Sequence, residues 1–270
     1  MGKHFAMIKS IKNICLILIV FLSACEKEDA GLINSKFSGL LYQVKFDNEL
    51  YYEYTYNDSN QIVEEKSKLH YIRHNYQNGK LISSDYYIDP GMFSSSSLIV
   101  DLAMKRKEWV NPTNTEKNST KTYSYDGLGK IVKSENYLGI SEYSYDNRNR
   151  VNRQTFYRDN ERTGYIDYTY DDNGNLIKQL HYWILASGDP ELQTTTEYKF
   201  DNKHNPYRAF NSIMIPGRYT NTNNIIKETY TIHFEVDQSI DKMQITKNAY
   251  RYNSQGYPIS KNDSETYIYH

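Results

Sequence analysis

The chain has 270 residues, with 32 Lys and Arg against 33 Asp and Glu, so its formal net charge is −1. A nearly neutral chain without a basic block does not indicate a nucleic-acid partner or electrostatic binding to an anionic membrane surface. The 28 tyrosines favour sheet faces that are half solvated over a thick aliphatic core, because each tyrosine hydroxyl needs water or a hydrogen-bond partner.

The first 24 residues have the features of a secretory signal. Three lysines precede an unbroken apolar run at 14–22, and the sequence Leu22-Ser23-Ala24-Cys25 follows. The run is too short to span a membrane, which takes roughly 20 residues. The ending resembles the lipobox of bacterial lipoproteins, and this resemblance implies that Cys25 is the lipidated first residue of the mature chain. The alternative is an ordinary signal peptide with an incidental cysteine.

The other cysteine, Cys15, lies inside the signal. The mature chain is therefore expected to have no disulfide, no thiol nucleophile and no cysteine-ligated metal. Residues 25–38 are predicted to form a polar tether, and its segment Glu26–Asp29 resembles the acidic export tag of surface lipoproteins. These features predict an outer-membrane, lipid-anchored protein. The acidic segment is consistent with exposure on the cell surface, but any tether tends to be polar, so both faces of the outer membrane stay open as locations.

Residues 39–270 form the predicted β domain and repeat one short pattern six times: aromatic, any residue, aromatic, Asp or Asn, then a turn. Alternate residues of a strand share a face, so both rings of a pair project the same way. The Asp or Asn starts the turn through its side chain, and a residue that tolerates a positive φ follows in the turn. The positions to which we assign a structural role in the repeat are Tyr54, Tyr56, Tyr123, Tyr125, Asp126, Gly129, Tyr143, Tyr145, Asp146, Tyr168, Tyr170, Asp171, Gly174, Tyr198, Phe200, Asp201, Tyr250, Tyr252 and Gly256.

Each return strand is expected to begin six residues after the second aromatic. In the fifth copy this rule places the bend at His204 and the strand start at Pro206, and a seventh hairpin turns at Asn78-Gly79. The repeat predicts an all-β fold, a curved antiparallel meander of about 14–16 strands, because long open sheets curl. Whether such a sheet stays open or closes in part is left undecided by the repeat. At most one short helix is expected, near 98–110.

This pattern resembles the YD repeat of RHS and teneurin-like proteins. The resemblance covers most of residues 42–270 and implies a β-sheet that winds into a spiral. The segments 201–207 and 223–225 are also similar to small YD-repeat lipoproteins of Gram-negative bacteria. The chain lacks the core-type segment, the self-cleaving protease region and the toxin domain of the large family members. The resemblance therefore implies a fold and a location rather than an activity.

Three stretches interrupt the repeat, at 88–121, 180–196 and 208–230, and we expect them to form loops that carry any binding function. Trp109 and Trp183 lie in or beside these stretches. They are candidate stacking platforms for a ligand, although buried plugs at the ends of the sheet are the favoured interpretation.

The search for catalytic, cofactor and metal residues finds none. His70 and His74 have the spacing of a helical zinc site, but on a strand they stand about 13 Å apart, so we interpret them as solvent-facing. The segment 171–175 resembles a calcium loop, but its glycine is misplaced and the terminal glutamate is missing. It is interpreted as a turn.

The sequence therefore predicts a non-catalytic envelope lipoprotein that is attached to the membrane through lipid on Cys25. Its ligand is expected to be a glycan, a peptide or another envelope protein, with no nucleic acid and no cofactor. One alternative is a glycoside hydrolase with two carboxylates about 5–10 Å apart. Another is an accessory or remnant of an RHS-type toxin system. A membrane barrel is disfavoured because many non-aromatic strand positions are polar.

Overall fold

One antiparallel sheet contains every strand in the described part of the chain. The computed structural model describes residues 38–88, 109–213, 216–217, 219–234 and 240–270, which belong to the compact unit Phe37–His270. The strands are β1 (Leu41–Phe46), β2 (Glu49–Tyr56), β3 (Ile62–Ser67), β4 (His70–Gln77), β5 (Lys80–Ile88), β6 (Ser119–Tyr125), β7 (Ile131–Asn136), β8 (Gly139–Tyr145), β9 (Val151–Arg158), β10 (Glu161–Tyr170), β11 (Leu176–Ile184), β12 (Pro190–Phe200), β13 (Ile225–Ile232), β14 (Lys242–Lys247), β15 (Tyr250–Tyr252), β16 (Pro258–Lys261) and β17 (Glu265–Tyr269).

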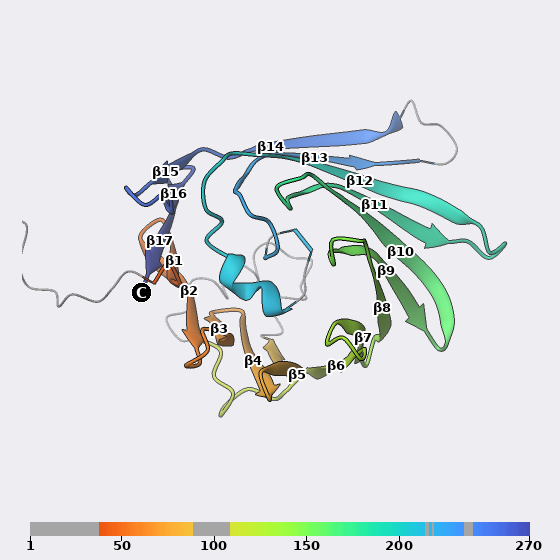
Figure 1. Cartoon of the computed structure of the whole chain (residues 1–270), viewed down its shortest axis with the longest axis horizontal. Coiled ribbons are helices and arrows are strands. Elements are labelled where there is room, and N and C mark those ends of the chain that lie inside the picture. The colour runs from red at the N-terminus through yellow and green to blue at the C-terminus, as the bar shows by residue number, and fades with distance from the viewer. Residues whose placement is uncertain (1–37, 89–108, 214–215, 218, 235–239) are drawn as a thin grey trace, which may run out of the picture. The chain divides into compact units, whose positions relative to one another are not determined.

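The strands follow each other as a meander from β2 to β14, and β1 joins β2 to β17. Strand β17 pairs with β16, which pairs with β15. Among the described strands β14 pairs with β13 and β15 pairs with β16, and no ladder joins β14 to β15, although only residues 248 and 249 separate them in the chain. The sheet curls back toward itself without closing (Figure 1). This confirms the predicted curved antiparallel meander, with 17 described strands where about 14–16 were expected.

The second aromatic of each repeat sits at a register shift, opposite the first residue of the return strand, as Tyr145 does with Val151. The repeat pattern predicts that both rings of a pair lie on one face, but it indicates no role for their hydroxyls. In four repeats the hydroxyl donates to a backbone carbonyl of another hairpin. These bonds join Tyr56 to Leu41 at 2.7 Å, Tyr125 to Leu81 at 2.8 Å, Tyr145 to Ile131 at 2.6 Å, and Tyr170 to Val151 at 2.8 Å. Each such bond contributes about 1 kcal/mol to stability.

The turns have the predicted chemistry. In the turn after β6, Asp126 Oδ1 accepts the N–H groups of Leu128 and Lys130 at 2.9 and 2.8 Å. The bend residue has a positive φ in five copies, with values of 58° at Asn60, 81° at Gly129, 62° at Asn149, 86° at Gly174 and 82° at Gly256.

The fifth repeat departs from the prediction. Its Asp201 N–H donates to the carbonyl of Asn224 rather than to a residue four positions on, and the return strand β13 begins at Ile225. His204 and Pro206 therefore lie inside an inserted segment, residues 202–223. It is the only described turn of the repeat that opens in this way, and it carries the 3₁₀ helix η2 (Arg208–Ile213). The concave side of the sheet faces this segment (Figure 1).

The inserted segment supplies four of the nine buried residues of one hydrophobic core and packs against the sheet through them. This core contains Leu41, Val44, Tyr54, Ile62 and Tyr267 of the sheet together with Tyr207, Phe210, Ile213 and Tyr219 of the insertion. A second core lies within the middle strands and contains Ile131, Tyr143, Val151, Tyr168 and Leu176.

The predictions for residues 180–196 and for a helix near 98–110 have different outcomes. Residues 180–196 are not an irregular loop, because they extend β11 and β12 into a long hairpin that turns at 185–189. The expected helix near 98–110 lies almost entirely outside the described residues, as do the signal, most of the tether and Cys25. Residues 109 and 110 have no regular structure. No described helix is long and apolar enough to cross a membrane.

Candidate functional site

A cavity of about 600 Å³ lies on the concave side of the sheet, and we call it the inner cavity. Its wall combines side chains of β1, β2, β11, β12, β13, β15, β16 and β17 with the inserted segment. Most of its polar groups are neutral amides and hydroxyls. They are contributed by Tyr51, Tyr52, Gln179, Tyr198, Asn205, Tyr207, Asn221, Asn223, Asn224, Asn248, Tyr250 and Tyr267.

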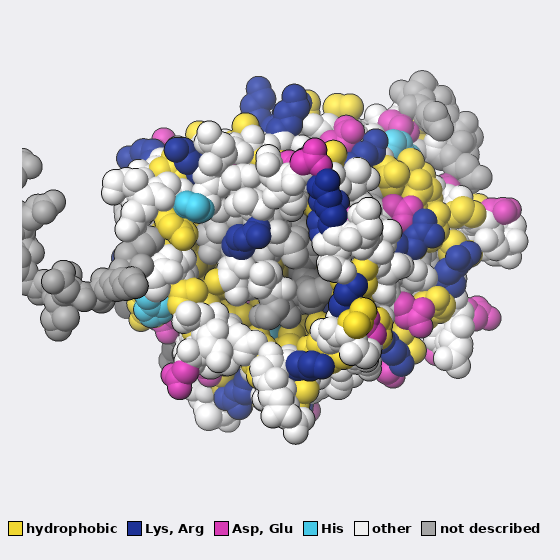
Figure 2. Space-filling model, viewed as in Figure 1, with side chains coloured by type: hydrophobic (Ala, Val, Ile, Leu, Met, Phe, Trp, Pro, Cys, Tyr) yellow, Lys and Arg dark blue, Asp and Glu magenta, His cyan; other side chains and the backbone are white. Residues whose placement is uncertain are grey.

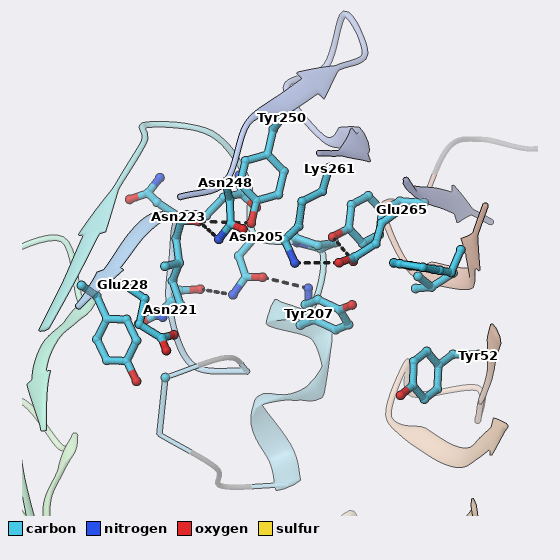
Figure 3. A pocket seen from close by; sticks show the side chains of 18 of the residues that line it. Tyr52, Asn205, Tyr207, Asn221, Asn223, Glu228, Asn248, Tyr250, Lys261 and Glu265 are labelled. Atoms are coloured by element: carbon cyan, nitrogen blue, oxygen red, sulfur yellow. Dashed lines mark hydrogen bonds and ion pairs between the residues drawn. The ribbon is translucent and has the colours of Figure 1, made fainter. Parts of the chain in front are cut away.

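The asparagines of the insertion fix its path. Asn205 Nδ2 donates to the carbonyl of Asn221 at 2.9 Å, and Asn221 Oδ1 accepts the N–H of Leu176, the first residue of β11, at 2.7 Å (Figure 3 shows the first bond). Asn223 exchanges two hydrogen bonds with Asn175, at 2.9 and 3.0 Å. These amides therefore hold the insertion against β11 as well as lining the cavity.

One amide donor of this wall is left over. The Nδ2 group of Asn221 is buried and has no hydrogen-bond partner. Burying such a donor without a partner costs about 1–3 kcal/mol, and unsatisfied polar groups of this kind are uncommon in native proteins.

The charged residues of the inner cavity are one ion pair and one separate carboxylate. Lys261 Nζ lies 2.7 Å from Glu265 Oε1, and Glu265 Oε2 accepts the hydroxyl of Tyr267 at 3.0 Å, so both oxygens of Glu265 are occupied. Glu228, on β13, forms no hydrogen bond or ion pair with any described residue. Figure 3 shows Glu228 and Glu265 on opposite sides of the cavity, with Asn205 between them. Glu228 is therefore the carboxylate that is available to a ligand.

The hydroxyls of Tyr198, Tyr250 and Tyr267 remain protonated at neutral pH. Burial raises the pKa of Tyr198 to about 12, and the negative charge of Glu228 adds to the shift. Burial also raises the pKa of Tyr250 and that of Tyr267, with further contributions from neighbouring tyrosines and Glu265. These hydroxyls can therefore donate as well as accept hydrogen bonds.

A second, shallower depression of about 330 Å³ surrounds Trp183, and we call it the tryptophan hollow. Its lining consists of Phe156, Thr163, Gly164, His181, Trp183 and Ile184. Trp183 lies on β11 and is 56% exposed, so it does not plug an end of the sheet as the favoured interpretation held. Trp109 is half-buried. The proposed role of either tryptophan as a ligand platform stays a prediction.

The prediction that His70 and His74 face solvent is wrong for His74, which lies in a buried polar cluster. His74 is only 3% exposed, and its ring lies between Ser84 and Glu65, with Nδ1 2.8 Å from Ser84 Oγ and Nε2 3.2 Å from Glu65 Oε1. His70 is half-buried. Ser84 is fully buried, so this hydrogen-bonded chain has no accessible nucleophile and is structural.

Of the predicted repeat residues, only Tyr198 and Tyr250 line the inner cavity. Among the described residues no group of three or more His, Cys, Asp or Glu side chains could hold a metal ion. Gln179, Glu228, Lys261 and Glu265 were not singled out, because they come from four strands and form no local motif. Charged side chains of both signs are interspersed on the face that Figure 2 shows.

No protein-family model matches the sequence, and the search of curated proteins found no match. Similar solved structures include a porin-like protein from Bacteroides uniformis, with 12% identity, a TM-score of 0.48, and coverage of 84% of this chain and 95% of the other. A porin-like protein from Bacteroides vulgatus has 12% identity, a TM-score of 0.40, and coverage of 86% and 98%. The Tc holotoxin pore of Photorhabdus luminescens has 18% identity and a TM-score of 0.32, covering 78% of this chain and 11% of that one. Identities this low assign no function to the chain.

Proposed function

We propose that this protein is a non-catalytic, lipid-anchored YD-repeat protein of the bacterial cell envelope that binds a carbohydrate in its inner cavity. The main observation behind this proposal is the chemistry of the cavity wall. Its polar side chains are mostly amides and hydroxyls, and Glu228 is its only charged group without an ion-pair partner among the described residues. Such a wall suits a neutral polyol, whose hydroxyl groups both donate and accept hydrogen bonds.

The remaining chemistry of the wall supports the same ligand class. The Tyr198 hydroxyl accepts a hydrogen bond from Gln179 Nε2 at 2.7 Å and keeps its own proton for another acceptor. The cavity also contains the rings of Tyr51 and Tyr52, whose faces can pack against the C–H face of a sugar.

The test is a binding screen on the full chain purified from membranes in detergent. We expect binding of at least one neutral oligosaccharide from a panel of plant, host and microbial glycans, and weaker binding in a Glu228→Ala variant. Binding of acidic polymers alone, or of no glycan at millimolar concentration, would overturn the proposal.

A glycoside hydrolase is the second candidate, because two carboxylates, Glu228 and Glu265, line the same cavity. Both oxygens of Glu265 are already occupied, by Lys261 and by the hydroxyl of Tyr267. This weighs against a hydrolase, since the second carboxylate has to reach the sugar or a water molecule. Incubating the full chain with each glycan that it binds separates the two functions. Release of shorter sugars that stops in Glu228→Gln would identify a hydrolase, and intact sugars would identify a binding protein.

A further inference from the structure

The inner cavity and the tryptophan hollow share one strand. Gln179 lines the cavity, and His181 and Trp183 line the hollow, at alternate positions of β11. The ladder between β10 and β11 runs without a register shift from Gly164–Trp183 to Thr169–Lys178. The three side chains therefore lie on the same, concave face of the sheet, and about 13 Å of strand separates Gln179 from Trp183.

The hollow leaves Trp183 56% exposed. Gly164 is the cross-strand neighbour of Trp183 on β10, and on its other side it pairs with Phe156 of β9. A Cβ atom at position 164 would come within 2.6 Å of the backbone oxygen of Tyr182, so no side chain is tolerated beside the indole. The ring of Phe156 packs edge-on against His181, with centroids 6.1 Å apart. The floor next to Trp183 is therefore shallow and lined in part by aromatic rings.

The strands around this floor exclude one common mode of recognition. Both edges of β11 are occupied, by β10 and β12, so an extended peptide cannot add to it through main-chain hydrogen bonds. Recognition there has to come from side chains. An exposed indole face at one end and amides and hydroxyls at the other fit a chain of sugar rings, which has apolar C–H faces and polar edges.

We propose that the inner cavity and the tryptophan hollow are two subsites of one lane along β11, which binds a neutral oligosaccharide of several units. The inner cavity takes one end of the oligosaccharide through hydrogen bonds, and Trp183 stacks on a ring further along. This inference rests on the proposed function and adds the length of the ligand and the role of Trp183.

Calorimetry on the full chain, with a disaccharide and a hexasaccharide derived from each of cellulose, xylan and chitin, tests the lane. We expect at least one series in which the hexasaccharide binds about fivefold tighter than the disaccharide, because stacking on an indole contributes about 1 kcal/mol. Trp183→Ala should remove that gain and leave the disaccharide affinity unchanged, whereas Trp183→Phe should keep part of it. Tyr137→Ala removes another exposed aromatic ring, 72% exposed in the β7–β8 turn, and should change neither affinity.

The outcomes separate the two proposals. A hexasaccharide that binds no tighter than its disaccharide, or a gain that survives Trp183→Ala, would overturn the lane and leave the inner cavity as a site for short sugars. The same melting temperature in Trp183→Ala and the unmodified chain will show that the fold is intact. Failure of every sugar to bind would overturn the proposed carbohydrate function and the lane with it.

Discussion

Gln179 donates a 2.7 Å hydrogen bond from Nε2 to the hydroxyl oxygen of Tyr198, linking β11 and β12 on the wall of the inner cavity. The bond ties the strand that carries Trp183 to the strand that neighbours Glu228, because Tyr198 lies opposite Glu228 across the β12–β13 ladder. The hydrogen bond thus fixes the position of the Tyr198 hydroxyl in the free protein. Less side-chain entropy would then be lost when the proposed carbohydrate binds.

Stability should fall at alkaline pH. The pKa values of Tyr86 and Tyr198 are raised from 10.0 to about 12, mainly by burial and then by the charges of Glu65 and Glu228 respectively. The folded state therefore holds these protons more tightly than the unfolded state. The stability from this difference is fully present below pH 10 and is lost as the pH rises from 10 to 12, by about 1.4 kcal/mol per pH unit for each tyrosine.

Urea unfolding between pH 10 and pH 12 measures this slope. In Tyr198→Phe the slope of the unfolding free energy against pH should be shallower by the contribution of one tyrosine, about 1.4 kcal/mol per pH unit. A free energy of unfolding that stays constant through pH 12 would contradict the burial of these hydroxyls.

The turn after β6 contains a matched pair of glycines. Gly129 has a φ of 81°, whereas Gly127 has no positive φ and open space around its Cα. Gly129→Ala should lower the free energy of unfolding by about 1 kcal/mol, because an alanine is strained in the left-handed region. Gly127→Ala should be neutral in the same urea titration. Equal effects of the two substitutions would show that the turn does not have the repeat geometry.

The buried ring of His74 is expected to be the strongest single polar contribution to β4. His74→Phe keeps a ring of similar size but leaves the buried carboxyl of Glu65 without its 3.2 Å partner, and should destabilise the protein by about 3 kcal/mol. Glu65→Gln keeps a hydrogen-bonding group and should cost about 1 kcal/mol. If urea unfolding gives both variants the stability of the unmodified chain, the histidine faces solvent, as the sequence first suggested.

Lipidation is predicted at Cys25, and the other cysteine, Cys15, serves as the control. Labelling cells with an alkyne fatty acid should tag the protein, and Cys25→Ser should abolish the tag while Cys15→Ser retains it. A tag that persists in Cys25→Ser would refute the anchor. Protease treatment of intact cells tests surface exposure separately, because a protein on the inner leaflet is protected from digestion.

Local rules were enough to predict most of the scaffold. The aromatic pairs, the Asp126 turn and the bend at Gly129 depend on residues a few positions apart, so the sequence specifies them directly. The fifth repeat shows where this reasoning fails. Counting six residues from Phe200 gives Pro206, but the hydrogen bond that closes the repeat comes from Asn224, and 22 residues lie between Asp201 and Asn224.

A signal for this insertion was present in the sequence. Asn224-Ile225 repeats the polar–aliphatic step of Asn175-Leu176 at the start of another return strand. The sequence holds no comparable signal for the inner cavity. Gln179, Glu228 and Lys261 lie on strands far apart in the chain, and only the curl of the sheet brings them to one cavity. The burial of His74 was missed for a related reason, since alternation along a strand does not tell which residues the rest of the fold will cover.

The sugar affinity of the Glu228→Ala variant tests most directly whether the inner cavity binds carbohydrate. Calorimetry should compare the full chain, Glu228→Ala and the control Glu161→Ala, an exposed glutamate in the β9–β10 hairpin, using the disaccharide that binds most tightly. We expect Glu228→Ala to bind about tenfold or more weakly, since a hydrogen bond to a charged group contributes about 1.5–3 kcal/mol, and Glu161→Ala to bind as the unmodified chain does. Equal affinities in all three proteins would contradict the claim.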